Sequence, residues 1–293
     1  MKNIVITGAS SGIGRETATT LVGKGWRVFG TVRQAEQALE LQAELGERFT
    51  PLLCDVREEE AVAAAASTVA RALGNERLQG LVNLAGVETV DALAVVPIRD
   101  VQNTFDVHVF GMLRMCQAFL PLLGADEGRD GPKGRIVNIS SVVGRWGAPF
   151  FGTYSSAKHA VEGMSDAMRR EFAHVGVDVV IVRPGNTKSG VFEKVRADDH
   201  DYIKGTIWEK PVADFRKLFL DGAVNGWPMR RVVAVIEKAL TARRPKAAYV
   251  AAAERIMNYT APTLSPPRVV DKVLEFRIKR RSGKPEGGPQ RPE

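Results

Sequence analysis

The sequence has little of what marks secreted, fibrous or membrane-spanning chains. Only two of its 293 residues are cysteine, Cys54 and Cys116, so no disulfide framework can form and a reducing cytoplasm is the expected location. No run of about 18 apolar residues and no signal-peptide pattern occurs, so we expect neither a spanning helix nor export. The contents of 28 Gly and 15 Pro are ordinary, which excludes collagen-like and disordered chains.

Positive charge is in modest excess and gathers at the carboxyl end. The 41 Lys and Arg outnumber the 34 Asp and Glu, and eight basic side chains against four acidic ones follow residue 267. Because the rest of the chain is nearly balanced, we expect no nucleic-acid partner. The cluster Lys279-Arg280-Arg281 could make weak contact with an anionic membrane surface, or could be a solvated tail.

Short β-branched runs alternate with segments whose apolar residues recur every three or four positions. This alternation predicts an α/β protein: a single-domain Rossmann-type doubly wound parallel sheet of about seven strands, with helices on both faces. The predicted strands are 4–7, 27–32, 50–54, 78–84, 135–140, 177–182 and, weakly, 247–250. The predicted helices are 14–21, 36–45, 58–73, 101–123 and 154–172.

The chain is expected to form one domain over residues 1–260, followed by a helical extension at 261–281 and a disordered tail at 282–293. Residues 190–230 follow the sixth strand and are predicted to form a lid over the substrate. The extension has apolar positions beside basic ones, so it could pack against the body, against a second subunit or on a membrane.

A glycine cluster joins the first strand to the first helix. Glycines at such a turn allow a tight bend, close approach of a pyrophosphate to the backbone and close packing of helix on strand, and the helix start offers free N–H groups to the anion. The spacing is G-x-x-x-G-x-G. The predicted phosphate-binding residues are Gly8, Ser10, Ser11, Gly12, Ile13 and Gly14.

The end of the second strand indicates which dinucleotide binds. No acid stands there to hold ribose hydroxyls, whereas Arg33 could meet a ribose 2′-phosphate with its guanidinium. NADP(H) is therefore expected in preference to NAD(H), which the same site could also accept. Two alternatives stay open: Arg33 solvates a loop, or Glu36 turns back to the ribose.

Tyr154 and Lys158 are spaced to share one face of a helix, and Ser141 follows a predicted strand. A neighbouring ammonium favours the phenolate and would lower the tyrosine pKa. We therefore expect Tyr154 to exchange a proton with a carbonyl or alcohol oxygen while Ser141 polarises that oxygen. No metal site is predicted.

Together these motifs, with Cys54-Asp55-Val56, Asn83-Leu84-Ala85-Gly86 and Pro184-Gly185, resemble the short-chain dehydrogenase/reductase family over about residues 1–250. The pattern is most similar to the hydroxysteroid and retinol dehydrogenase branch. The resemblance implies adenine contacts from Asp55 and Val56, cofactor-ribose contacts from Asn83, Ala85 and Gly86, and a nicotinamide-ribose contact from Lys158. It also implies that Pro184, Gly185, Thr187 and Ser189 hold the nicotinamide and phosphate end, and that the enzyme is a homodimer or homotetramer.

His108 departs from the family pattern, which has asparagine at this position to hold a proton-relay water. We count His108 among the candidate catalytic residues, because imidazole can also bond a water. It could equally be a satisfied buried histidine. Leu84 is a second departure, where the pattern has asparagine and only a local hydrogen bond is at stake.

Aromatic residues are enriched in the predicted lid: Phe192, Tyr202, Trp208, Phe215, Phe219 and Trp227. Trp146, Phe150 and Phe151 precede the tyrosine and are predicted to line the same pocket. Such rings favour an apolar substrate, although they could merely pack the lid on the body.

The sequence thus predicts an NADP(H)-dependent oxidoreductase that interconverts a hydrophobic alcohol and its aldehyde or ketone. A dinucleotide-sensing regulatory protein of the same fold, with little turnover, is the alternative. The substrate, the physiological direction and the oligomeric state are not determined by the sequence.

Overall fold

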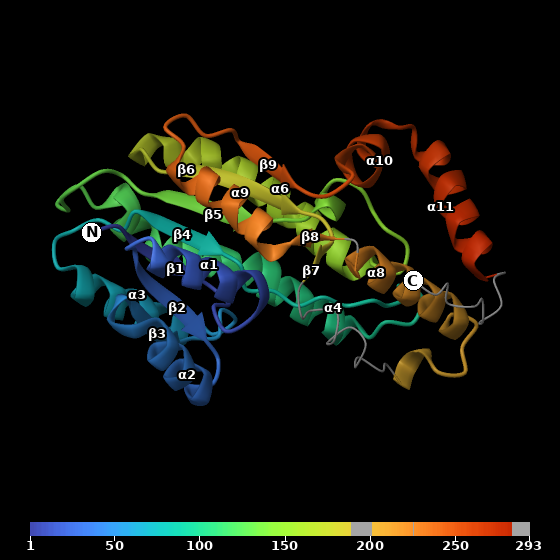
Figure 1. Cartoon of the computed structure of the whole chain (residues 1–293), viewed down its shortest axis with the longest axis horizontal. Helices are drawn as coiled ribbons and strands as arrows, with labels where there is room; N and C mark the ends of the chain where they lie inside the picture. Colours follow the sequence, from blue (N-terminus) through green and yellow to red (C-terminus); the bar gives the residue numbers. More distant parts are fainter. Residues whose placement is uncertain (189–200, 225, 283–293) are drawn as a thin grey trace, which may run out of the picture.

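The computed structural model describes residues 1–188, 201–224 and 226–282, and its centre is a seven-stranded parallel sheet (Figure 1). The strand order is β3-β2-β1-β4-β5-β6-β9, and each pairing is parallel. The strands are β1 (Asn3–Ile6), β2 (Arg27–Val32), β3 (Phe49–Leu53), β4 (Gly80–Asn83), β5 (Arg135–Ile139), β6 (Asp178–Pro184) and β9 (Ala248–Ala251). The predicted fold class and all seven strands are confirmed.

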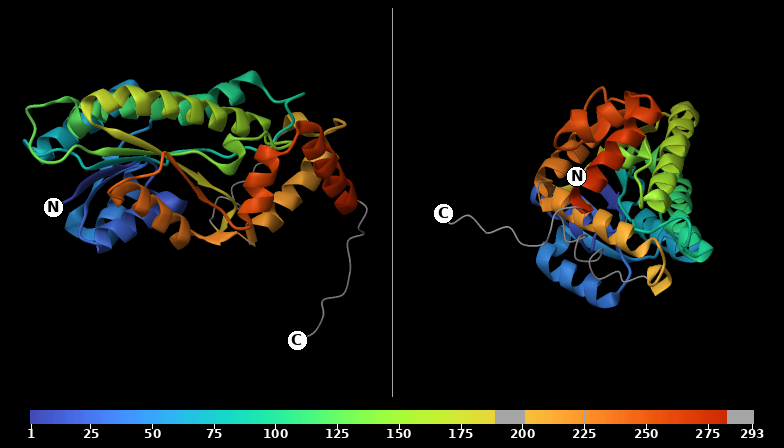
Figure 2. Two further views of the ribbon diagram at one scale, coloured as in Figure 1. Left: turned by 90° about the horizontal axis from the view of Figure 1, so that it is seen from above. Right: turned by 90° about the vertical axis from the view of Figure 1, so that its right-hand side faces the viewer.

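Helices cover both faces of the sheet (Figure 2). The helices α3 (Glu59–Leu73), α4 (Ile98–Phe105), α5 (Gly111–Leu120) and α6 (Gly152–Glu171) lie on one face; α1 (Gly12–Gly23), α2 (Ala35–Leu45) and α9 (Met229–Thr241) lie on the other. Alternate residues of β1 supply the two cores, Val5 on one side and Ile4 and Ile6 on the other. Burial on both faces explains why the strands are continuously apolar.

One helical run is as long and apolar as a membrane span. It is Ile98–Ala125, in which π-helical turns η2 (Asp106–Phe110) and η3 (Pro121–Ala125) continue α4 and α5. In its most apolar window 61% is buried inside the fold, and it carries core residues such as Met115 and Phe119. The run is therefore a core helix, and no other helix in the described residues meets the length and composition of a span.

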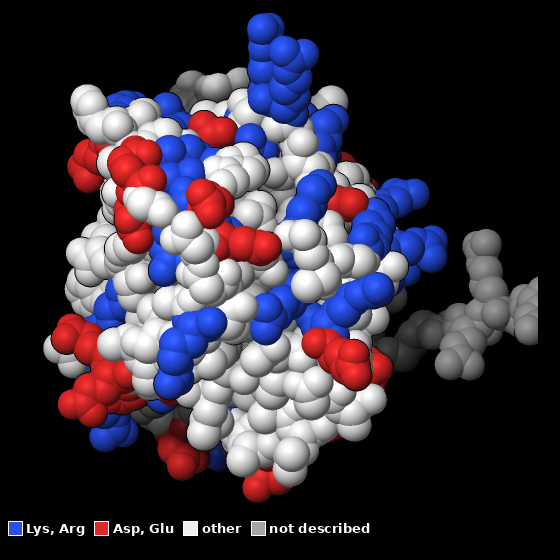
Figure 3. Space-filling view, turned by 90° about the vertical axis from the view of Figure 1, so that its left-hand side faces the viewer, with Lys and Arg blue, Asp and Glu red and all other residues white. Residues whose placement is uncertain are grey.

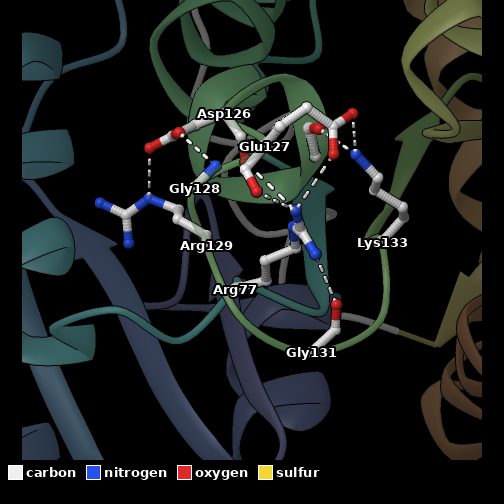
Figure 4. A network of polar contacts seen from close by, with 8 residues as sticks. Arg77, Asp126, Glu127, Gly128, Arg129, Gly131 and Lys133 are labelled. Atoms are coloured by element: carbon white, nitrogen blue, oxygen red, sulfur yellow. Dashed lines mark hydrogen bonds and ion pairs between the residues drawn. The ribbon is translucent and has the colours of Figure 1, made fainter.

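A polar cluster fastens the loop before β5, at the amino edge of the sheet (Figure 4). The Arg77 guanidinium donates to the carbonyl of Gly131 at 2.7 Å, and Lys133 Nζ donates to the carboxylate of Glu127 at 2.7 Å. Because ligands bind at the opposite, carboxyl edge in open α/β sheets, we assign this cluster to stability. On the face shown in Figure 3, basic and acidic side chains are interspersed.

The carboxyl-terminal segments gather beyond the carboxyl edge of the sheet (Figures 1 and 2). They comprise η6 (Asp201–Ile203), α8 (Glu209–Val224), η7 (Ile256–Thr260), α10 (Ala261–Leu264) and α11 (Pro267–Ser282); β7 (Thr187–Lys188) pairs with β8 (Trp227–Pro228). The predicted extension is helical, and α11 contacts α8. Phe276 of α11 is 64% exposed and is therefore free to contact another surface. Contact of this helix with a membrane stays a prediction. Ser282, where the disordered tail was expected to begin, is the last residue of α11. The rest of the expected tail, 283–293, and part of the expected lid lie outside the described residues.

Candidate active site

A cavity of about 1070 Å³ opens at the carboxyl edge of the sheet. It runs from the turn after β1 and the end of β2, past the segments after β4 and β5, to α8 and the carboxyl-terminal helices. The strand order reverses between β1 and β4, which is the place where open α/β sheets bind ligands. The volume is large enough for a dinucleotide and a substrate together.

The glycine turn fits a dinucleotide. Gly8 has φ +70° and Gly12 has φ +56°, conformations that side chains rarely adopt. A Cβ on Gly14 would lie 2.1 Å from the carbonyl oxygen of Gly8, whereas one on Gly12 would meet nothing within 4 Å. Gly14 therefore permits close packing of α1, and Gly12 leaves the backbone open to the cavity. Ser10, Ser11 and Ile13 line the same turn.

The Thr7 hydroxyl links the turn after β1 to the segment after β4. It accepts hydrogen bonds from the backbone N–H groups of Leu84 at 2.8 Å and Ala85 at 2.9 Å. Ala85 and Gly86 line the cavity, and their contact with the cofactor ribose stays a prediction. Asn83 does not: its side chain is buried, and its Nδ2 donates to Asn138 Oδ1 at 2.8 Å, linking β4 to β5 behind the cavity.

Arg33 lines the cavity at the end of β2, and its side chain is exposed. Gln37, which the sequence analysis missed, also lines the cavity. Glu36 is not among the lining residues. Asp55 and Val56 also line this end. Hydrogen bonds from Arg57, 2.7 Å at the closest, hold the pKa of Asp55 below its usual value, and the charge of Arg33 acts in the same direction.

Tyr154 and Lys158 lie one turn apart on α6, and Ser141 lies two residues after the end of β5. All three line the cavity and are buried. Lys158 Nζ lies 5.5 Å from the centre of the tyrosine ring and donates to the carbonyl oxygen of Ile139 at 2.8 Å. Ser141 Oγ accepts from Val143 N at 3.3 Å and also bonds the Tyr154 hydroxyl. The arrangement places the Tyr154 phenol, the Ser141 hydroxyl and the Lys158 ammonium close together in the cavity.

Comparison with known proteins agrees with this geometry. The family model described as short chain dehydrogenase matches residues 2–200. The chain belongs to the short chain dehydrogenase family. It is an NAD(P)-dependent oxidoreductase of the hydroxysteroid and retinol dehydrogenase branch.

Relatives match over nearly the whole chain. An NADPH-dependent 3-dehydrocapnine reductase from Ornithobacterium rhinotracheale is 34% identical over 96% of this chain and 98% of its own length. A 17-beta-hydroxysteroid dehydrogenase type 6 from Bos taurus is 30% identical over 93% of this chain and 87% of its own. A solved short-chain dehydrogenase from Streptomyces avermitilis is 27% identical with a TM-score of 0.74, covering 97% of this chain and 98% of that one.

The environment of the site shifts the pKa values of this dehydrogenase in a direction the sequence did not predict. Burial, reinforced by the charge of Glu88, raises the pKa of Tyr154 well above its usual value, and the hydrogen bond with Ser141 only partly opposes this. Burial lowers the pKa of Lys158 to about 8. The prediction that Lys158 brings the phenol's pKa down is wrong here, because desolvation of the phenolate dominates.

His108 is buried in the π-helical turn η2, and its ring packs on that of Tyr154. Its Nε2 lies 2.7 Å from the carbonyl oxygen of Val87 and 3.1 Å from Val87 N, and its ring meets that of Tyr154 edge-on at 5.4 Å between centres. Burial lowers the pKa of His108 well below its usual value, so the imidazole is neutral. Its contacts therefore fix the Tyr154 ring and the Val87 backbone.

The aromatic lid reaches the cavity in part. Tyr202, Phe215 and Phe219 line it together with Trp146 and Phe151. Other predicted rings do not: Phe150 packs on Trp208 and Phe215, Trp227 lies outside the lining, and Phe192 is outside the described residues. The ring centre of Phe151 lies 4.6 Å from that of Tyr154 and 5.2 Å from that of Phe219. The rings therefore both pack on the body of the protein and form an apolar wall of the cavity.

Pro184, Gly185 and Thr187 line the cavity, and Thr187 Oγ1 donates to the carbonyl oxygen of Gly185 at 3.0 Å. Ser189 lies outside the described residues. The sequence analysis missed Glu88, which lines the cavity, and whose position two residues after Gly86 could have marked it. In the described residues, no group of three or more His, Cys, Asp or Glu side chains could hold a metal ion.

Proposed function

We propose that this dehydrogenase interconverts a hydrophobic secondary alcohol or aldehyde/ketone pair by hydride transfer with NADP(H), and that Tyr154 is the general acid and base. The observation that carries the proposal is the convergence of Tyr154, Ser141 and Lys158 in one cavity with the glycine turn and the aromatic wall.

The bound nicotinamide would supply or accept the hydride; the protein supplies proton transfer and orientation. With its pKa raised, the Tyr154 hydroxyl keeps its proton at neutral pH, and it would give that proton to a carbonyl oxygen that becomes basic as the hydride arrives. Ser141 Oγ, beside that hydroxyl, holds the same oxygen. Lys158, anchored on Ile139, keeps a positive charge near the phenol as negative charge develops there.

The choice of NADP(H) rests on Arg33. Its guanidinium lines the ribose end of the cavity, and no Asp or Glu follows β2 directly. A bidentate contact with a 2′-phosphate suits this group. The relative from Ornithobacterium rhinotracheale, which is named as NADPH-dependent, supports the same choice.

The hydrophobic substrate rests on the wall formed by Phe151, Phe215 and Phe219. Relatives named as retinol and 17-beta-hydroxysteroid dehydrogenases support it. A cytoplasmic location remains our proposal; both cysteines are free and buried, and burial raises the pKa of Cys54 to about 11. The homodimer or homotetramer likewise remains a proposal.

The test follows NADPH absorbance with all-trans-retinal, a 17-ketosteroid and aliphatic ketones of increasing length. Tyr154→Phe is expected to lower kcat by roughly 10²–10⁴-fold, because it removes only the proton donor. Tyr249→Phe is the matched control, since Tyr249 lies on β9 outside the cavity lining. Equal rates for Tyr154→Phe and the parent protein would refute the proposal.

A parallel series tests the cofactor. Arg33→Ala is expected to raise the KM for NADPH by roughly tenfold or more while leaving that for NADH nearly unchanged, since a charge-assisted hydrogen bond contributes about 1.5–3 kcal/mol. An equal change for both cofactors would show that Arg33 does not contact the 2′-phosphate.

A further inference from the structure

Glu88 stands in the catalytic cavity on a fixed piece of backbone. It is half-buried, it lines the cavity, and it lies next to Val87, whose carbonyl oxygen and N–H are both within hydrogen-bonding distance of His108 Nε2. Its charge is close enough to Tyr154 to raise the pKa of the phenol. A carboxylate thus shares the cavity with the proposed proton donor and acts on it electrostatically.

The described part of the chain places no countercharge in contact with this carboxylate. Within residues 1–188, 201–224 and 226–282, no hydrogen bond or ion pair reaches the Glu88 side chain. Lys158 attracts it from beyond ion-pair distance but donates its own hydrogen bond to Ile139. Arg33, the other Lys or Arg among the described lining residues, lies at the end of the cavity formed after β2, and His108 is neutral. Burial raises the pKa of Glu88 to about 7, because the ionised carboxylate is poorly solvated there.

We propose that Glu88 binds a protonated amine of the substrate, positioned beside the carbonyl that Tyr154 protonates, so that the substrate is a hydrophobic amino ketone or the matching amino alcohol. An ammonium ion in the cavity supplies the missing countercharge. It also offsets the field that Glu88 exerts on Tyr154, so the phenol becomes a stronger acid when an amino substrate is bound. The substrate class rests on the proposed function.

Binding tests the proposal without turnover. Isothermal titration calorimetry of the NADPH-loaded protein compares dodecylamine with dodecan-1-ol at pH 7.5. We expect the amine to bind roughly 10- to 100-fold more tightly, as a charge-assisted hydrogen bond predicts, and Glu88→Gln to remove the difference. If the amine binds no more tightly than the alcohol to the parent protein, the proposal is wrong.

Kinetics adds a matched pair, 2-aminotetradecan-3-one hydrochloride and tetradecan-3-one. Glu88→Gln is expected to lower the ratio of kcat/KM for the amino ketone to kcat/KM for the plain ketone by roughly 10- to 100-fold. The ratio is the readout because the loss of the Glu88 charge acts on Tyr154 with either substrate. Glu254→Gln is the matched acid: Glu254 lines the cavity but is exposed and does not act on the Tyr154 pKa. An equal loss of the amino-ketone preference in both variants would contradict a specific role for Glu88.

The outcomes separate the two proposals. Turnover of the plain ketone with no preference for amines refutes the role of Glu88 and leaves the oxidoreductase function intact. Tight amine binding without turnover of any carbonyl compound refutes the proposed reaction and supports the cation site. Thermal unfolding and NADPH binding of Glu88→Gln, both expected to match the parent protein, verify that the variant folds.

Discussion

Replacing His108 with asparagine separates a packing role from a catalytic one. The change removes an edge-on contact with Tyr154, which contributes about 0.5–1.5 kcal/mol, and weakens the hydrogen bond to Val87, which contributes a similar amount. His108→Asn should therefore lower the free energy of unfolding by about 1–3 kcal/mol, measured by urea titration. His159→Asn, at an exposed position on α6, is the control and should change it by less than about 0.5 kcal/mol.

Turnover should be retained or increased in the same variant. The buried imidazole is neutral because its pKa lies well below the usual value, and its Nε2 is engaged with the Val87 backbone. It is therefore not expected to carry a proton in each cycle. The assay is kcat together with NADPH affinity. A fall of roughly a hundredfold in kcat, about 2.7 kcal/mol, with unchanged cofactor affinity would show that the imidazole has a catalytic task of its own.

Three further changes probe the cofactor turn, the core and the site charge. Gly14→Ala should weaken NADPH binding by at least tenfold in a calorimetric titration, because the new Cβ would lie 2.1 Å from the Gly8 oxygen. Glu162→Ala should lower the free energy of unfolding by about 3 kcal/mol in a urea titration, because it leaves the Arg183 guanidinium, which is only 14% exposed and is bonded to Glu162 at 2.6 and 2.8 Å, without its countercharge. In a pH profile, kcat/KM should fall as pH rises through about 8, where Lys158 loses its proton.

Controls for these changes come from the same chain. Gly23→Ala, where a Cβ meets nothing within 4 Å, should leave NADPH binding unchanged. Breaking the exposed pair between Lys24 and Glu237 should change stability by less than about 1 kcal/mol. The pKa of Lys158 is about 8 in the folded protein and about 10.5 in the unfolded chain. Between these pH values the unfolded chain binds the extra proton, so the contribution of Lys158 to the free energy of unfolding rises with pH. An activity loss that tracks thermal unfolding would contradict that assignment.

The sequence predicts well those features that depend on local pattern. Continuous apolar strands and three-four periodicity determine the sheet, and the spacing of Tyr154 and Lys158 places them on one face of α6 whatever surrounds them. The glycine turn is predicted for the same reason: Gly8 needs a positive φ and Gly14 a missing Cβ, both local demands of a tight strand-to-helix connection.

Features that depend on where a side chain points, or on how deeply it is buried, could not be predicted. Asn83 turns into the core to bond Asn138, and Phe150 turns away from the cavity toward Trp208. The pKa of Tyr154 depends on desolvation by residues far away in the sequence, which outweighs the neighbouring ammonium.

The cavity wall is divided along the chain. Its cofactor end comes from the turns after β1, β2 and β4, whereas its far end includes Phe219 of α8, Asn258 of η7 and Leu274 of α11. Variation in the carboxyl-terminal third can therefore reshape what is recognised while the redox machinery is left untouched. Exchanging residues 201–276 between relatives would therefore be a direct way to change the substrate selectivity of one common catalytic scaffold.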